Sequence, residues 1–288
     1  MTRFLKGHGT ENDFILLPDS AQLDPRAPVP ELTAEQVRRL CDRHAGIGAD
    51  GVLRVLPVGT ATEAEALDTA TARWFMDYRN ADGSVSEMCG NGARLFARYL
   101  REAGLETADA FDLATRGGVR RISVSPAGEV SVDMGPATSG VTSAAELSGA
   151  RFPGQQMSLP NPHLVCLTDV GVSALDLTRP PVVDNGLFPA GVNVEFVNLI
   201  SADGDPPRVR MRVYERGVGE TRSCGTGACA VAAHVLARLG RDTGSVLVEV
   251  PGGRVTVSVT PETTVLGGPA VFVATGDIDP AWWARIPY

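Results

Sequence analysis

A cysteine–glycine motif occurs twice in this chain, and each copy runs into an apolar stretch. The first copy, "EMCGNGARL", spans residues 87–95, and the second, "RSCGTGACA", spans residues 222–230. One such motif would carry little information. Two copies in 288 residues predict duplicated halves that each present a cysteine at the same structural point. The chain is long enough for two domains of ordinary size.

The flanks of the two motifs repeat as well. Each motif follows a strand-like segment and a glycine turn, and each precedes a helical pattern closed by a glycine, Gly104 or Gly240. Upstream, "GTENDFILL" resembles "GVNVEFVNL", which aligns Asn12 with Asn193. The helix in "GACAVAAHVLARLG" is apolar on nearly every face, so we expect curved sheet to enclose it.

The repeat predicts an α/β fold of the α+β type. We expect two pseudo-symmetric domains, each a mixed, mostly antiparallel sheet wrapped around a central buried helix. The N-terminal half should cover residues 1–135, with residues 276–288 packing back on it, and the C-terminal half residues 136–275. The stretch from 130 to 150, which contains the small, polar "GPATSGVTSAAELSG", should hold the junction.

The position of each cysteine at a helix start has chemical consequences. Free N–H groups and the helix dipole favour a thiolate there, and the adjacent glycines let a carboxylate approach the backbone closely. Two such cysteines can remove a proton from one face of a carbon and return one to the other face. The sequence therefore indicates inversion of a centre next to a carboxylate. Lys6 is the chain's single lysine, and nothing suggests a pyridoxal site.

The charge, the apolar segments and the cysteines of the chain argue against a nucleic-acid-binding, a membrane or a disulfide-bonded protein. A net charge of −8 argues against nucleic acid as a partner. The sequence has neither a signal peptide nor a membrane span, so we expect a cytoplasmic protein. Its five cysteines should be thiols.

Seven motifs, taken in order, resemble the diaminopimelate epimerase family along nearly the whole chain. They are "KGHGTENDF" (6–14), "DYRNADGS" (77–84), "MCGNGAR" (88–94), "NPH" (161–163), "GVNVEF" (191–196), "YERGVGET" (214–221) and "SCGTGA" (223–228). The resemblance implies interconversion of LL- and meso-2,6-diaminopimelate, in lysine and peptidoglycan precursor synthesis. It also implies that no metal or other cofactor takes part, and it allows a homodimer.

The resemblance also assigns roles to residues. Cys89 and Cys224 are the acid–base pair, with Cys224 the base and Cys89 the acid in the LL to meso direction. His163 and Glu215 tune the two thiols. The backbone of four residues holds the reacting carboxylate: Gly90, Asn91, Gly225 and Thr226. Six side chains hold the rest of the amino acid substrate: Asn12, Asn80, Asn161, Asn193, Glu215 and Arg216.

Two positions depart from the family's pattern. Gly51 stands where the family often has Gln, which removes any side-chain contact from that point. Pro160 stands where Gly commonly precedes "NPH", which stiffens the approach to Asn161.

Several alternatives remain open from the residues. The first is another amino acid racemase of the same fold, of the proline or hydroxyproline type, although Glu215 and Arg216 would then be unexplained. A non-catalytic amino-acid-binding module would need no second cysteine, and a cysteine hydrolase would need a paired histidine base. Cys224 and Cys229 have poor spacing for zinc. The remaining cysteines are interpreted as buried small hydrophobic residues: Cys41, Cys166 and Cys229.

Overall fold

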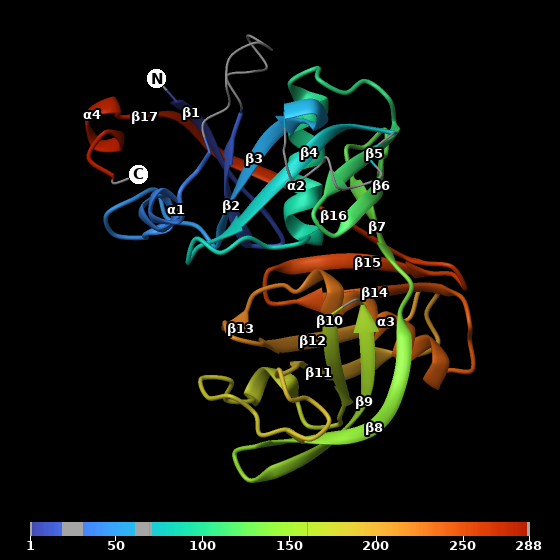
Figure 1. Ribbon diagram of the computed structural model, residues 1–288. Coiled ribbons are helices and arrows are strands. Elements are labelled where there is room, and N and C mark those ends of the chain that lie inside the picture. Colours follow the sequence, from blue (N-terminus) through green and yellow to red (C-terminus); the bar gives the residue numbers. More distant parts are fainter. Residues whose placement is uncertain (1, 19–30, 61–68, 70, 160, 287–288) are drawn as a thin grey trace. The chain divides into compact units, whose positions relative to one another are not determined.

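The computed structural model describes residues 2–18, 31–60, 69, 71–159 and 161–286 (Figure 1). Its contacts divide the chain into two compact units, which we call the first unit (residues 1–132 and 270–288) and the second unit (residues 133–269). The C-terminal segment that joins the first unit begins at residue 270 rather than 276, because all of β17 (Val271–Ile278) pairs with β1 (Thr2–Gly9). Pro160 lies outside the described residues.

The first unit is built on one mixed sheet. Neighbouring strands run in the order β17-β1-β2-β3-β4-β5-β6-β7, and only the pairs β2–β3 and β4–β5 are parallel. The remaining strands are β2 (Asn12–Leu17), β3 (Gly51–Pro57), β4 (Ala72–Asn80), β5 (Ala110–Thr115), β6 (Gly118–Val124) and β7 (Val130–Gly135), which runs over the boundary between the units.

The second unit repeats this topology. Its order is β8-β9-β10-β11-β12-β14-β15-β16, and again only the third and fifth pairs are parallel. The strands are β8 (Thr138–Leu147), β9 (Ala150–Leu159), β10 (Asn161–Leu167), β11 (Asn193–Ser201), β12 (Arg208–Glu215), β14 (Gly244–Val250), β15 (Gly253–Val259) and β16 (Thr264–Gly268), and the short β13 (Gly219–Thr221) pairs with β12. β8 therefore occupies much of the stretch expected to be a junction.

A helix lies against the sheet of each unit, as the two motifs predicted. In the first unit α2 (Gly90–Glu102) packs on β1 to β4 and on β6, and in the second α3 (Gly225–Arg238) packs on β9 to β11 and on β14 to β16 (Figure 1). The glycines that end them, Gly104 and Gly240, have φ of 68° and 70°, a conformation that glycine adopts at low cost. Among the described residues, the other helical segments are α1 (Ala34–Cys41), α4 (Pro280–Trp283), η2 (Val58–Thr60) and η4 (Val172–Ala174). No helix of the described residues is long and apolar enough to cross a membrane.

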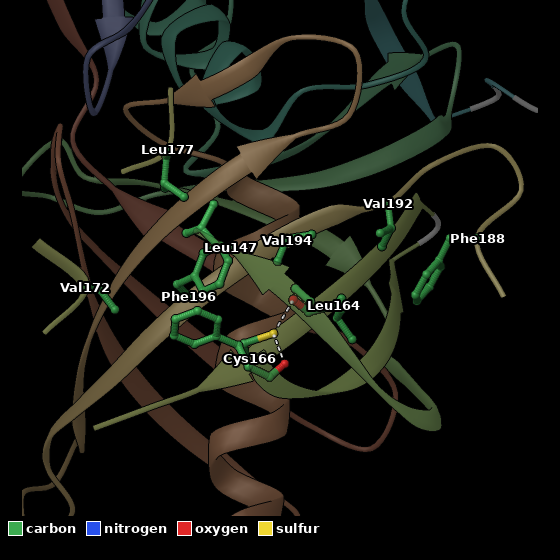
Figure 2. Packing of buried hydrophobic residues seen from close by; sticks show 11 residues of the cluster. Leu147, Leu164, Cys166, Val172, Leu177, Phe188, Val192, Val194 and Phe196 are labelled. Carbon is green, nitrogen blue, oxygen red and sulfur yellow. Dashed lines mark hydrogen bonds between the residues drawn. The ribbon is translucent and has the colours of Figure 1, made fainter. Parts of the chain in front are cut away.

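The opposite face of each sheet carries a second apolar layer. In the first unit this layer includes α1, whose predicted capping box forms between Thr33 and Gln36, and it buries Cys41. In the second unit the thiol of Cys166 lies beside Phe196 and Leu164 and points toward backbone carbonyls (Figure 2). Burial raises the pKa of both thiols to about 12, so both behave as the predicted core residues.

The strand registers correct one alignment made from the sequence. Phe14 pairs with Gly51 across the parallel strands β2 and β3, and His163 pairs with Asn193 across β10 and β11. In the two topologies, β2 and β3 hold the same places as β10 and β11. Asn12, two residues before Phe14, is therefore equivalent to Asn161, two residues before His163. Asn193 is equivalent to Gly51 and not to Asn12. The alignment was wrong because the connections before β3 and β11 differ in length and obscure the register.

Candidate active site

Cys89 is the N-cap residue of α2. Its backbone is extended, with φ −140° and ψ 119°, and the Gly92 N–H donates to its sulfur at 3.5 Å. The thiol is only half-buried and donates to Asn12 Oδ1, 3.6 Å away. Asn12 starts β2, the strand that passes the helix start, so tertiary packing brings it to the cysteine.

Asn12 and Asn91 are held in fixed orientations. Asn91 Nδ2 donates to Asn12 Oδ1 at 3.1 Å, and Asn12 Nδ2 donates to Asp50 Oδ2 at 2.9 Å. Behind them lies a fully buried Arg94, which donates to Asn91 Oδ1 at 2.9 Å and to Thr10 Oγ1 at 3.2 Å. Sequence reasoning missed Arg94, although an arginine inside the motif "MCGNGAR" on a buried helix was a usable signal.

Asn80 ends β4 and begins the turn that leads toward Cys89. Its Nδ2 donates to Ser84 Oγ at 3.0 Å, and the turn closes through Gly83, which has φ 86°. Asn80 pairs across the sheet with Gly51, where a Cβ would lie 2.6 Å from the Arg79 carbonyl oxygen. A larger residue at 51 would therefore need a backbone shift. We call Asn12, Asn80, Cys89, Gly90 and Asn91 the first half-site.

Cys224 is the N-cap residue of α3, in the same extended conformation, with φ −117° and ψ 116°. The Gly227 N–H donates to its sulfur at 3.4 Å, and Thr226 Oγ1 lies 3.5 Å from the sulfur. Unlike Cys89, it is buried, with 6% of its surface exposed. The two cysteines therefore occupy equivalent points with different access to solvent.

A chain of polar side chains leads from β11 to Cys224. Asn161 Nδ2 donates to Thr226 Oγ1 at 3.3 Å, and its Oδ1 lies 3.0 Å from His163 Nε2. His163 Nδ1 lies 2.7 Å from Oε1 of Glu195, and both side chains are fully buried. Glu195 was not singled out from the sequence, because a single glutamate in a strand commonly faces solvent.

Three further predicted residues meet at the ends of β11 and β12. Asn193 Oδ1 accepts from the Arg216 backbone N–H at 2.9 Å, and the Thr221 hydroxyl donates to Glu215. The exposed Arg216 side chain packs on Gly191, whose φ is 78°, and donates to the Ala190 carbonyl oxygen at 3.3 Å. We call the following residues the second half-site: Asn161, His163, Asn193, Glu215, Arg216, Cys224, Gly225 and Thr226.

The electrostatics of Cys224 differ from the expectation for a helix start. Burial first, and then the carboxyls of Glu215 and Glu195, raise the pKa of Cys224 well above its usual value, while the Thr226 hydroxyl and the Gly227 N–H oppose the change. Burial likewise raises the pKa of Glu215 and of Glu195. The prediction of a lowered pKa is wrong for this thiol, because desolvation outweighs the helix terminus.

Comparison with known proteins identifies the family. Residues 4–139 and 157–273 match the sequence profile described as "Diaminopimelate epimerase". The chain is 50% identical to the diaminopimelate epimerase of Rhodococcus opacus, over 97% of this chain and 98% of that protein. It is 49% identical to that of Mycolicibacterium smegmatis, over 98% and 99% of the two chains. The chain belongs to the diaminopimelate epimerase family.

Solved structures of low identity share the fold of this family member. A phenazine biosynthesis protein of the PhzF family from Bacillus anthracis has a TM-score of 0.65 at 16% identity, covering 96% of this chain and 98% of its own. A probable proline racemase from Agrobacterium radiobacter has a TM-score of 0.62 at 16% identity, covering 98% and 96%. Their likeness confirms the α/β fold class. The far higher identity to diaminopimelate epimerases disfavours the racemase alternative.

Proposed function

We propose that this member of the diaminopimelate epimerase family interconverts LL- and meso-2,6-diaminopimelate, with Cys89 and Cys224 as the two acid–base groups. The observation that supports this most is the equivalence of the two thiols. Each one caps the central helix of its unit, at the same point of the same eight-strand topology. Inversion needs one group to remove a proton and another to return one from the opposite face, and two equivalent thiols supply that pair.

We assign the reacting carboxylate to the starts of both helices. In our proposal it accepts from the backbone N–H groups of Gly90, Asn91, Gly225 and Thr226. Loss of the α-proton places negative charge on this carboxylate, and helix N-termini stabilise that charge where it develops. The proposed steps use only groups of the chain itself, in keeping with the expectation that no cofactor is needed.

The substrate itself activates Cys224 in this proposal. The carboxylate of Glu215 is one cause of the raised pKa of Cys224. An ammonium group bound to Glu215 offsets that negative charge and lowers the pKa of the thiol. Cys224 then becomes the base that takes the α-proton of the LL isomer, and Cys89, whose thiol donates to Asn12, returns a proton to the other face.

The distal end of the substrate is assigned to polar side chains around the two half-sites. Arg216 suits a carboxylate, since its guanidinium can donate two parallel hydrogen bonds, and Glu215 suits the ammonium. Four asparagines complete this set: Asn12, Asn80, Asn161 and Asn193. A smaller amino acid without the distal ammonium and carboxylate would lose its contacts with Glu215 and Arg216, so we expect it to bind poorly.

The assay that tests the proposal follows the stereochemistry directly. Purified protein with LL-diaminopimelate should give the meso isomer, measured by proton NMR, and should give no turnover with L-proline or trans-4-hydroxy-L-proline. Turnover of proline in place of diaminopimelate would contradict the proposal. A cytoplasmic location, a homodimer and the absence of a nucleic-acid partner stay predictions from the sequence.

A further inference from the structure

A buried carboxyl lies behind Cys224 and has no part in the proposed substrate contacts. Glu195 is fully buried on the face of β11 that meets α3, and a Cβ on Gly227 would lie 2.7 Å from its Oε1. Among the described residues, its Oε2 has no hydrogen-bond partner. A carboxyl in such a place destabilises the fold unless it is paired with a hydrogen-bonding partner. That partner is His163, at 2.7 Å.

The hydrogen bonds from this pair to Cys224 have a defined direction. An amide oxygen can only accept, so the proton between His163 and Asn161 Oδ1 belongs to His163 Nε2. Asn161 Nδ2 in turn donates to Thr226 Oγ1, which leaves the hydroxyl hydrogen of Thr226 free to donate to the sulfur 3.5 Å away. A hydroxyl aimed in this way stabilises the thiolate of Cys224.

Glu195 is what keeps the proton on Nε2. If the carboxyl carries the proton shared with Nδ1, the neutral ring holds its own proton on Nε2. If the ring carries it, the imidazolium is protonated at both nitrogens. Without Glu195, the neutral ring is free to place its proton on Nδ1. The Asn161 amide would then turn its oxygen to Thr226, whose hydroxyl would donate to that oxygen and not to Cys224.

We infer that Glu195 is a positioning residue, which fixes the proton of His163 on Nε2 and so directs the Thr226 hydroxyl toward Cys224. The first unit has apolar residues in place of this histidine–glutamate pair. The registers place Phe14 and Leu53 at the positions equivalent to His163 and Glu195. The inference rests on the proposed function only where it concerns the basicity of Cys224.

The first test replaces Glu195 by the residue that the first unit has there. Glu195→Leu should lower kcat for LL to meso conversion by about 10- to 100-fold, the range seen when a partner that orients a histidine is lost. KM should rise by a smaller factor than kcat falls, because Glu195 reaches the substrate only through the amide of Asn161. Glu195→Gln should recover most of kcat, since its amide N–H can donate to Nδ1. Val197→Ala, in the same strand and equally buried, controls for a weakened core and should keep kcat.

The second test reads the ring itself and needs no turnover. Nitrogen-15 NMR should show His163 protonated on Nε2 in the unsubstituted protein and shifted toward the Nδ1 form in Glu195→Leu. His163→Gln identifies the signal among the four histidines. An unchanged tautomer in Glu195→Leu would overturn the inference. Absence of any diaminopimelate turnover in the unsubstituted protein would instead overturn the proposed function.

A double-mutant cycle tests the link to Thr226. Thr226→Val removes the hydroxyl, so adding Glu195→Leu should cause no further loss of kcat. Losses that multiply would show that Glu195 acts by another route and would refute the inference. If Glu195→Leu does not fold, the double variant His163→Phe with Glu195→Leu restores an apolar pair and should fold. Its kcat should fall as far as that of Thr226→Val, and full activity would contradict the account.

Discussion

The two half-sites share their backbone and differ in the side chains around it. Cys89 and Cys224 cap equivalent helices, and each accepts from the glycine N–H three residues later. Around Cys89 the neighbours are neutral amides, and the thiol donates to Asn12. Around Cys224 lie two carboxyls that raise its pKa, and a histidine that is hydrogen-bonded to one of them. A duplicated fold therefore gives two equivalent thiols different electrostatic surroundings.

The equivalent positions show how this difference arises. His163, Glu195 and Glu215 stand where the first unit has Phe14, Leu53 and Asn80. At each of these three positions the second unit has a titratable side chain and the first unit has a non-titratable one. The difference between the two half-sites thus lies in side chains, while the strands that carry them keep one register.

Loss of either cysteine should have the largest effect. Cys89→Ala and Cys224→Ala should each lower kcat by about 10⁴-fold or more, the upper range for acid–base catalysis, because neither half-site can replace the other. Circular dichroism should show an intact fold in both. Cys166→Ala, in the core of the second unit, is the matched control and should remain active. Activity above a few per cent in either cysteine variant would refute the two-thiol assignment.

The distal end of the substrate should be the next most sensitive point. An analogue that lacks the distal ammonium or carboxylate leaves Glu215 or Arg216 without its substrate partner, and kcat/KM should fall by about 10³- to 10⁴-fold. The DD isomer should also fail, since neither of its centres offers an L-configured distal end. Assays in which the analogue or the DD isomer competes with LL-diaminopimelate measure the ratio of the two kcat/KM values. Comparable turnover of the DD and LL isomers would contradict the assignment of the second half-site.

Two equivalent glycines allow the half-sites to be perturbed in the same way. A Cβ at Gly227 would lie 2.7 Å from Glu195 Oε1, whereas at Gly92 the nearest atom is a movable methyl carbon of Leu53, 3.2 Å away. Gly227→Ala should therefore displace the Glu195 carboxyl, which lies next to Cys224, and lower kcat by about 10²-fold. Gly92→Ala should leave most of the activity. Equal losses of kcat in the two variants would contradict the difference between the half-sites.

The smallest expected effect concerns thiol reactivity. The Glu215 carboxylate raises the pKa of Cys224, so Glu215→Gln should lower that pKa and speed alkylation of Cys224 by iodoacetamide at alkaline pH. One pKa unit corresponds to about a tenfold change in thiolate fraction. Asn80→Asp, at the equivalent position, should slow the alkylation of Cys89. Mass spectrometry separates the two sites, and unchanged Cys224 reactivity in Glu215→Gln would count against the electrostatic difference.

Local signals predicted more of this molecule than long-range ones. The helix starts at Cys89 and Cys224, the terminal glycines and the capping box of α1 were predictable, because each depends on neighbours in sequence. The equivalence of Asn12 with Asn161 was not, since the loops between the paired strands differ in length. The burial of Glu195 and the raised pKa of Cys224 depend on which sheet face meets α3, and that is a property of tertiary packing.

The fate of the transferred proton tests the central claim most directly. In D₂O, starting from LL-diaminopimelate, early meso product should carry deuterium at the inverted carbon, because the returning proton comes from a thiol that has exchanged with solvent. Recovered LL substrate should carry almost none, because its proton is held on Cys224. Mass spectrometry of both pools at low conversion measures this. Early meso product largely free of deuterium would mean that one base serves both faces, and would contradict the division of labour between Cys89 and Cys224.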